Sequence, residues 1–170
     1  LRQIENLTTG LSDGTWFCDD PAGQAALDKM TAAIMIGQDI PYDVQVRAVN
    51  DPMFNAFALP GGQIILMRGL IDKAATPDQV AGVLAHEFGH TINRDPTRLS
   101  LRSAGSAGLL GLVFGDFAGG FAALALAEAL MSANYSQEAE TDADTFSHEI
   151  FAKAELPSAR FATFFEHLID

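Results

Sequence analysis

The chain has 170 residues, enough for one folded domain, and its 48% hydrophobic and 19% charged residues are typical of a globular protein. A formal net charge of −12 excludes nucleic acid as the partner, because phosphates need a basic surface, and excludes electrostatic docking on anionic lipid for the same reason. The single cysteine, Cys18, excludes an internal disulfide and a zinc site built from cysteines.

The first part of the chain predicts little regular structure. We expect one domain over residues 1–170, with an irregular lead-in over residues 1–22. The sequence starts at Leu1 without a methionine or a signal peptide, so we expect a fragment of a longer protein. Apolar residues then recur at helical spacing from Gln24 to Ile36, which predicts an amphipathic helix.

Three strands are expected next. Polar and apolar residues alternate over residues 43–48, which predicts a half-buried strand. Residues 55–59 and 64–67 predict two more strands, and Pro60-Gly61-Gly62 between them is a strong turn signal.

A helix start signal follows the strands. Thr76 is placed as the N-cap, Pro77 occupies the first helical position, and Gln79 would close a capping box. We expect this helix to continue to about Asn93 and to be stopped by Pro96.

Residues 103–132 are unusually rich in glycine, alanine and leucine. Asp116 splits them into two apolar runs, each shorter than the about 20 residues that a membrane-spanning helix needs. We favour an insert of two short, closely packed helices near the cleft; the other interpretation is an element that touches or enters a membrane. Further helices are predicted over residues 133–154 and 158–168.

The most informative pattern is His86-Glu87-Phe88-Gly89-His90, in the middle of the capped helix. Residues four apart share one helical face, so both imidazoles can bind the same zinc ion. Glu87 lies beside the open position of the metal, where it can take a proton from water as a general base. Two surface histidines on an ordinary helix are the other interpretation, which the apolar character of this helix disfavours.

A catalytic zinc needs a third protein ligand. The residues after His90 contain no nearby histidine, which leaves a carboxylate from a separate helix. Glu140 and Asp144 form an i, i+4 pair, so one can bind zinc while the other accepts the N–H of a ligand histidine. A solvated acidic helix face is the alternative.

Three ordered blocks carry a family resemblance. They are residues 55–62 with Gly69-Leu70, residues 84–90, and Tyr135-Ser136 followed by Glu140-x-x-Ala143-Asp144. Together these blocks resemble the HtpX and CAAX-prenyl-protease family of zinc metallopeptidases, which are gluzincins. The resemblance covers most of residues 50 to 165.

The resemblance implies roles for particular residues. Glu140 would be the third zinc ligand, and Asp144 would support His86. The segment Asn55, Ala56, Phe57 and Ala58 would be the edge strand to which a substrate chain adds as an extra β-strand. The implied fold is α+β: a mostly helical short zincin with a small β-sheet beside the active-site helix.

Some features depart from the family or stay open. Many members carry a further histidine in a Thr-His-Pro block beyond the final helix, and this chain reaches Asp170 without one. His148 lies four residues after Asp144 and could assist at the metal, whereas we expect His167 to be structural. For Cys18 we favour a buried hydrophobic role over capping of the zinc.

These observations predict a metalloendopeptidase that binds one Zn²⁺ per chain and acts on protein or peptide substrates. A proteolytically latent zincin-fold chaperone or binding domain is the alternative function. The resemblance implies a place in the bacterial cell envelope, with membrane contact as part of that expectation. The sequence does not indicate an oligomeric state.

Overall fold

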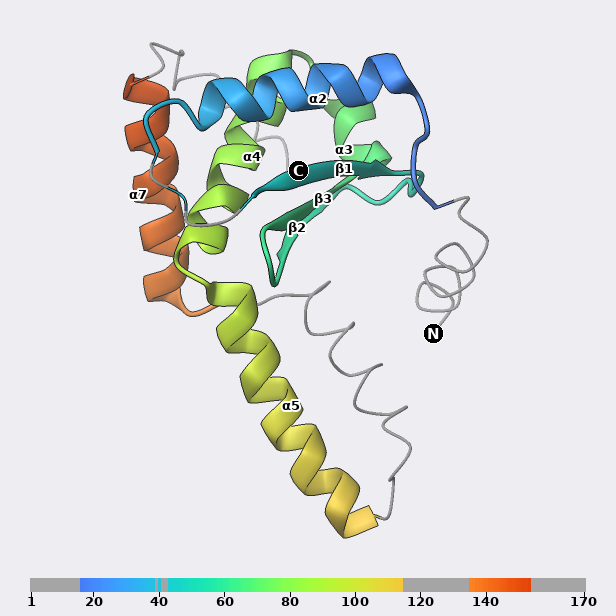
Figure 1. Cartoon of the computed structure of the whole chain (residues 1–170), viewed down its shortest axis with the longest axis vertical. Coiled ribbons are helices and arrows are strands. Elements are labelled where there is room, and N and C mark those ends of the chain that lie inside the picture. Colours follow the sequence, from blue (N-terminus) through green and yellow to red (C-terminus); the bar gives the residue numbers. More distant parts are fainter. Residues whose placement is uncertain (1–15, 39, 41–42, 115–134, 154–170) are drawn as a thin grey trace.

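The computed structural model describes residues 16–38, 40, 43–114 and 135–153, which form a small sheet and a set of helices around it (Figure 1). The elements are α2 (Pro21–Ile34), β1 (Gln45–Val49), β2 (Ala56–Leu59), β3 (Gln63–Met67), α3 (Arg68–Lys73), α4 (Pro77–Ile92), α5 (Asp95–Phe114) and α7 (Gln137–Lys153). The predicted mixed, mostly helical α+β fold is confirmed.

The sheet has the order β1-β3-β2, so β2 lies at an edge of the described sheet. β1 pairs in parallel with β3, and β2 pairs antiparallel with β3, with Phe57 opposite Ile65. The predicted turn joins β2 to β3, and Gly61 and Gly62 have φ angles of 90° and 86° there. Such positive φ angles favour glycine, which explains the turn signal in the sequence.

Each face of the sheet packs against apolar side chains. On one face Ala58, Ile64 and Leu66 join a core with α2, α4 and α7. On the other face Phe57 and Ile65 form a smaller cluster with residues that include Trp16. Successive strand residues point to opposite faces, so the sheet is buried on both sides and holds its edge in place.

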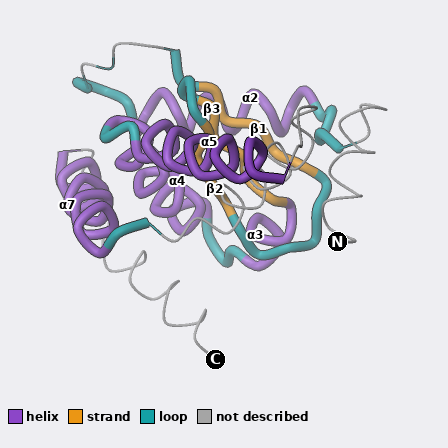
Figure 2. The backbone as a smooth tube through the Cα atoms, turned by 90° about the horizontal axis from the view of Figure 1, so that it is seen from below, coloured by secondary structure: helices purple, strands orange, loops and turns teal. Residues whose placement is uncertain are grey.

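The helix α4 lies between α7 and the sheet (Figures 1 and 2). It is buried along most of its length, with Leu84 and Ala85 fully covered. Its side toward the sheet meets Ala56 and Ala58 in β2, whose short side chains let the helix approach the strand closely. The fold therefore places the middle of α4 against the sheet edge.

Two helix starts differ in detail from the predictions. α2 begins at Pro21, three residues early, because the Asp20 carboxylate accepts hydrogen bonds from the first amides of the helix. α4 begins at Pro77 as predicted, but the hydroxyl of Thr76 makes no capping bond. The Gln79 side chain accepts the N–H of Ala75 in place of the N-cap amide, so the predicted capping box is wrong.

Pro96 has a different role from the predicted one. α4 ends at Ile92, and Arg94 turns the chain with a φ of 60°. Pro96 then occupies the first turn of α5, where its missing N–H costs nothing. The proline therefore starts the next helix, and the turn at Arg94 ends α4.

The glycine- and alanine-rich segment is described only up to Phe114. Up to that residue it continues α5, a single helix that begins at Asp95 and extends away from the sheet (Figure 1). Residues 115–134 and the predicted helix over residues 158–168, with His167, lie outside the described residues. None of the described helices combines the length and the unbroken apolar sequence that crossing a bilayer requires.

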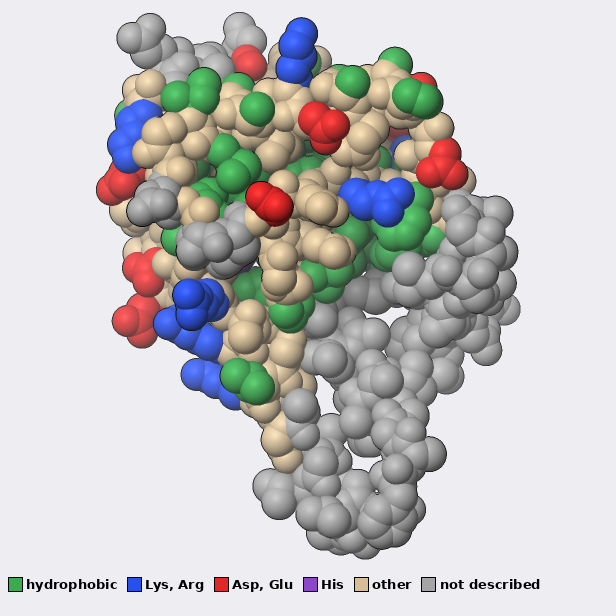
Figure 3. Space-filling view, in the orientation of Figure 1, with side chains coloured by type: hydrophobic (Ala, Val, Ile, Leu, Met, Phe, Trp, Pro, Cys, Tyr) green, Lys and Arg blue, Asp and Glu red, His purple; other side chains and the backbone are tan. Residues whose placement is uncertain are grey.

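α7 corresponds to the helix predicted over residues 133–154, but it is slightly shorter and extends from Gln137 to Lys153. Acidic side chains lie along its side of the molecule, and a basic group lies below them (Figure 3). Glu138 and Asp142 are exposed on this helix, as a solvated acidic face requires. Glu140, by contrast, turns toward α4.

Candidate metal centre

The centre is built where α4 packs against α7. His86 and His90 lie one turn apart on α4, with ring centroids 4.7 Å apart. Glu140 comes from the first turn of α7. One ligand atom from each of these three residues lies within 4.8 Å of the other two. The structure thus brings together the three predicted ligands from two helices.

The distances within this group suit a zinc ion. The two Nε2 atoms are 3.1 Å apart, and Oε2 of Glu140 is 3.4 Å from Nε2 of His86 and 3.8 Å from Nε2 of His90. Donor atoms held about 2.0–2.2 Å from a tetrahedral zinc lie roughly 3.3–3.6 Å from one another. The three atoms therefore surround a space of the right size for the ion.

The hydrogen bonds of the two rings leave both Nε2 atoms free to face a metal ion. Nδ1 of His86 is 2.9 Å from Oδ1 of Asp144, and Nδ1 of His90 is 3.1 Å from Oδ2 of Asp95. An ionised carboxylate only accepts, so each Nδ1 carries the proton and each Nε2 presents a lone pair. Two lone pairs and the Glu140 carboxylate then face one another, an arrangement that a metal ion between them stabilises.

Asp95 is a supporting residue that the sequence analysis missed. Its side chain is 5% exposed and pairs with His90, which is 2% exposed. It comes five residues after His90, beyond the end of α4, and reaches back because Arg94 reverses the chain. The signal that could have found it is an acidic residue shortly after the second histidine.

Glu87 is buried beside the metal position. The Ala58 N–H donates to its carboxylate, which anchors the side chain to β2. Burial raises the pKa of Glu87 from 4.5 to about 8; the Ala58 N–H opposes this rise, and the negative charge of Glu140 adds to it. A carboxyl group with a pKa near neutrality is suited to exchanging protons with a substrate.

β2 turns part of its main chain away from β3. The Asn55 carbonyl accepts the Met67 N–H, and hydrogen-bonded pairs alternate along antiparallel strands. Ala56 and Ala58 therefore direct their main-chain groups toward the free side. The Ala56 N–H donates to Oδ1 of Asn55 at 2.9 Å, and the Ala58 N–H donates to Glu87. The carbonyl groups of Ala56 and Ala58 pair with no further strand of the described sheet.

Close packing fixes the distance between α4 and α7. A Cβ atom added at Gly89 would lie 2.7 Å from Cα and 3.1 Å from the carbonyl oxygen of Ala143. Ala143 is itself fully buried. Only glycine permits this approach, so the sequence at these two positions sets how far Glu140 stands from the histidines.

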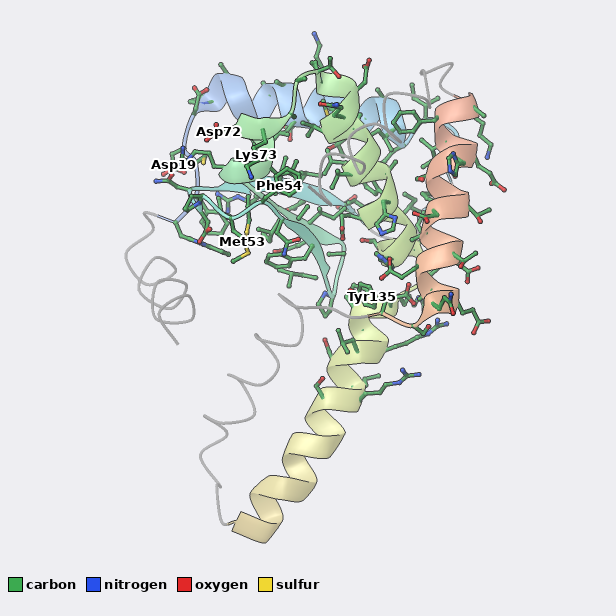
Figure 4. All side chains as sticks on the ribbon, turned by 180° about the vertical axis from the view of Figure 1, so that it is seen from behind. Asp19, Met53, Phe54, Asp72, Lys73 and Tyr135 are labelled. Carbon is green, nitrogen blue, oxygen red and sulfur yellow. The ribbon has the colours of Figure 1, made fainter. Side chains whose placement is uncertain are left out.

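Tyr135 borders the same centre and was not predicted to have a role there. Its ring lies against that of His90, with centroids 4.1 Å apart. It sits where the end of α4, the start of α5 and the start of α7 meet (Figure 4). Burial raises the pKa of its phenol, and the negative charges of Glu87, Asp95 and Glu140 add to this rise.

Two other candidates lie apart from the ligand cluster. His148 is exposed on α7 and is not among the three converging residues. Cys18 is half-buried and, with Pro77, lines an apolar cleft of about 480 Å³ at the start of α4. Pro77 precedes His86 by about two and a half helical turns, so the thiol contributes nothing to the metal position.

Comparison with known sequences identifies similar proteins. Residues 21–169 match the sequence profile of "Peptidase family M48". The chain is 35% identical over 113 residues to the mitochondrial metalloendopeptidase OMA1 of Saccharomyces cerevisiae, covering 65% of this chain and 32% of that protein.

Two bacterial proteins are similar over more of the chain. The metalloprotease LoiP of Escherichia coli is 29% identical over 153 residues, covering 81% of this chain and 57% of LoiP. A putative beta-barrel assembly-enhancing protease of Vibrio cholerae is 32% identical over 164 residues, covering 89% of this chain and 34% of that protein. The chain thus spans between about a third and somewhat over half of these relatives.

Proposed function

The chain belongs to peptidase family M48, and we propose that it is the catalytic domain of a zinc-dependent metalloendopeptidase that cleaves peptide bonds in proteins. The observation that carries this proposal is the convergence of His86, His90 and Glu140 beside the buried Glu87. Three protein ligands with an open fourth position are the arrangement of catalytic zinc sites, whereas structural sites are closed by four.

The three converging residues would hold the zinc ion, with Asp144 and Asp95 orienting the two imidazoles. When bound, zinc polarises the carbonyl group of the scissile bond and makes a water molecule more acidic. The ligand atoms belong to two helices that pack tightly at Gly89, so the site is held ready before substrate arrives.

Glu87 performs the proton transfers in this proposal. In its ionised form a carboxylate oxygen accepts a proton from the attacking water, and the carboxyl group then donates this proton to the nitrogen of the leaving amine. The hydrogen bond from Ala58 limits the rotation of the Glu87 side chain. The same group can therefore serve as base and acid in turn.

A substrate chain would lie along the free side of β2. Its N–H groups would donate to the carbonyl oxygens of Ala56 and Ala58, in the manner of an added β-strand. Asn55 supports this edge because its side chain accepts the Ala56 N–H. Main-chain bonds of this kind select an extended conformation and give little preference for particular side chains.

The relatives suggest where the enzyme works. One is named as mitochondrial and another for beta-barrel assembly. We therefore propose a role in the quality control of membrane and envelope proteins, within the bacterial cell envelope and in contact with its membrane.

Paired substitutions test the catalytic assignment. Glu87→Gln should lower cleavage of a quenched fluorescent peptide by about 10²–10⁴-fold while the protein keeps its zinc, because Glu87 moves protons and binds no metal. Glu140→Ala should lose both activity and zinc. Zinc content by elemental analysis and peptide cleavage with and without a chelator measure both expectations.

The controls separate an enzyme from a latent zincin-fold domain. Thr31 lies on α2 and is not part of the ligand cluster, so Thr31→Val should keep wild-type cleavage and zinc. A zinc-loaded wild type that cleaves no peptide faster than Glu87→Gln does would favour the chaperone or binding alternative. Retained cleavage by Glu87→Gln would show that another group is the base.

A further inference from the structure

Tyr135 has a buried phenol oxygen that makes no hydrogen bond within the part of the chain that the structure describes. An unpaired buried hydroxyl destabilises the folded protein, so such groups are rare and call for an explanation. Two others are known among the described residues, on Thr31 and Thr76. Of these three, Tyr135 is the one whose ring packs on a residue of the metal centre.

The tyrosine lies directly beside the metal centre. The tyrosine ring is tilted by 33° against His90 at a centroid distance of 4.1 Å. The negative charges of Glu87, Asp95 and Glu140 all act on the phenol. The phenol, whose ring packs on His90, therefore lies within electrostatic reach of both the base and the third metal ligand.

The local chain holds the tyrosine firmly at this point. Tyr135 directly precedes Ser136, whose hydroxyl accepts the Ala139 N–H and whose carbonyl accepts the Glu140 N–H. The same turn therefore positions the phenol and the third metal ligand. Any shift of one moves the other, which suits two groups that act on one substrate.

The chemistry of the centre lacks what a phenol supplies. When Glu87 is ionised, its carboxylate, that of Glu140 and the Nε2 atoms of both histidines all present acceptors. Attack of water on a peptide bond moves negative charge onto the carbonyl oxygen, and this charge is stabilised by hydrogen-bond donors. A phenol ordinarily has a pKa of about 10, so at neutral pH it keeps its proton and can act as a donor.

We propose that Tyr135 is a further catalytic residue, whose O–H donates a hydrogen bond to the carbonyl oxygen of the scissile peptide bond as negative charge develops there. The inference rests on the proposed peptidase function. It assigns a donor to a reaction for which the sequence analysis found none. The unpaired hydroxyl then has a reason: its partner arrives with the substrate.

Tyr135→Phe tests this role because it removes the hydroxyl and keeps the ring on His90. The zinc-loaded variant should cleave the fluorescent peptide with kcat lowered about 10²-fold, the loss typical of one missing donor, and with KM changed less than about 3-fold. A phosphonamidate analogue of the same peptide should bind about 10²-fold more weakly. A thiol analogue, which has no tetrahedral oxygen, should bind equally well.

Two further readouts distinguish catalysis from packing. Zinc content should be unchanged, and the metal-free variant should melt at or above the wild-type temperature, because the lost hydroxyl made no bond. Thr31→Val is the matched control: it deletes another unpaired buried hydroxyl, on α2, and should alter neither turnover nor inhibitor binding.

The outcomes separate this inference from the proposed function. If the wild type cleaves the peptide and Tyr135→Phe cleaves it equally fast, the inference is wrong and the peptidase stands. Loss of zinc or a lower melting temperature in Tyr135→Phe would mean a structural role and would also overturn it. If the zinc-loaded wild type itself cleaves nothing, the proposed function fails first.

Discussion

The metal centre has two halves that make the same contact in opposite surroundings. On the α7 side, His86 bonds to Asp144, whose side chain is 59% exposed. On the α5 side, His90 bonds to Asp95, whose side chain is 5% exposed. Water competes for the first carboxylate and screens it, but does not reach the second. The same carboxylate–imidazole hydrogen bond therefore contributes more to zinc binding on the buried side than on the exposed side.

The α7 half depends on packing, because its groups reach the histidines only while α7 stays close to α4. Gly89→Ala should break this half most severely, since its Cβ would lie 2.7 Å from Cα of Ala143. We expect zinc affinity to fall more than about 100-fold, as Glu140 moves away, and stability to fall by about 1–3 kcal/mol. Competition with a chelating dye and thermal melting measure the two effects.

Gly69→Ala is the control for Gly89→Ala. Gly69 lies in α3, which carries none of the zinc ligands. A Cβ atom added there would lie 2.1 Å from the carbonyl oxygen of Pro52. It should lower the melting temperature as well, yet leave the zinc affinity of the folded protein within about 3-fold of wild type. Equal zinc affinity in both variants would mean that the Gly89 contact does not position Glu140.

Substitution of the two supporting carboxylates tests the comparison directly. Asp95→Asn should lower zinc affinity about 10–100-fold, because the imidazole loses a charged partner in a site without water. Asp144→Asn should cost less than about 10-fold, since solvent can replace the exposed carboxylate. The measurement is zinc affinity by dye competition at two salt concentrations. Equal losses, or a larger loss at Asp144, would contradict the role given to burial.

The sequence predicts a contact of the metal centre well when the two residues are close along the chain, and poorly when they are far apart. His86 and His90 could be predicted because the geometry of one helix turn fixes their separation. Glu140 and Asp144 lie 50 or more residues away in the sequence. Their i, i+4 spacing predicted only that two acidic side chains share one helical face. The separate roles of zinc ligand and supporting residue came from the family resemblance.

Asp95 could not be predicted by the same reasoning. It reaches His90 because Arg94 adopts a φ of 60°, a conformation that is uncommon for arginine and that no local pattern indicated. Tyr135 was part of a matched block but had no role, because its contact with His90 depends on how α7 docks. The predicted capping bond of Thr76 is wrong for a related reason. A local sequence pattern favours the bond, but the packing around the start of α4 leaves the hydroxyl without it.

The smallest expected effect on zinc affinity concerns Glu87, which is buried as Asp95 is but has no cationic partner among the described residues. Its pKa is about 8 in the folded state and 4.5 when unfolded. A raised pKa contributes stability that is fully present below pH 4.5 and is lost as the pH rises toward 8. The metal-free wild type should therefore lose stability over this range relative to Glu87→Gln, which has no proton to release.

Melting temperatures at pH 5, 6, 7 and 8 in the presence of a chelator measure this difference. The wild type should fall by roughly 10 °C relative to Glu87→Gln between pH 5 and pH 8, because a pKa that differs this much between the two states changes the free energy of unfolding by about 3–4 kcal/mol over this range. Both variants keep the same histidines and differ only at residue 87. Zinc should abolish the difference, since a nearby cation favours the ionised carboxylate. Parallel curves without zinc would mean that Glu87 is already ionised in the metal-free protein at these pH values. Burial would then not raise the pKa of Glu87 as described above.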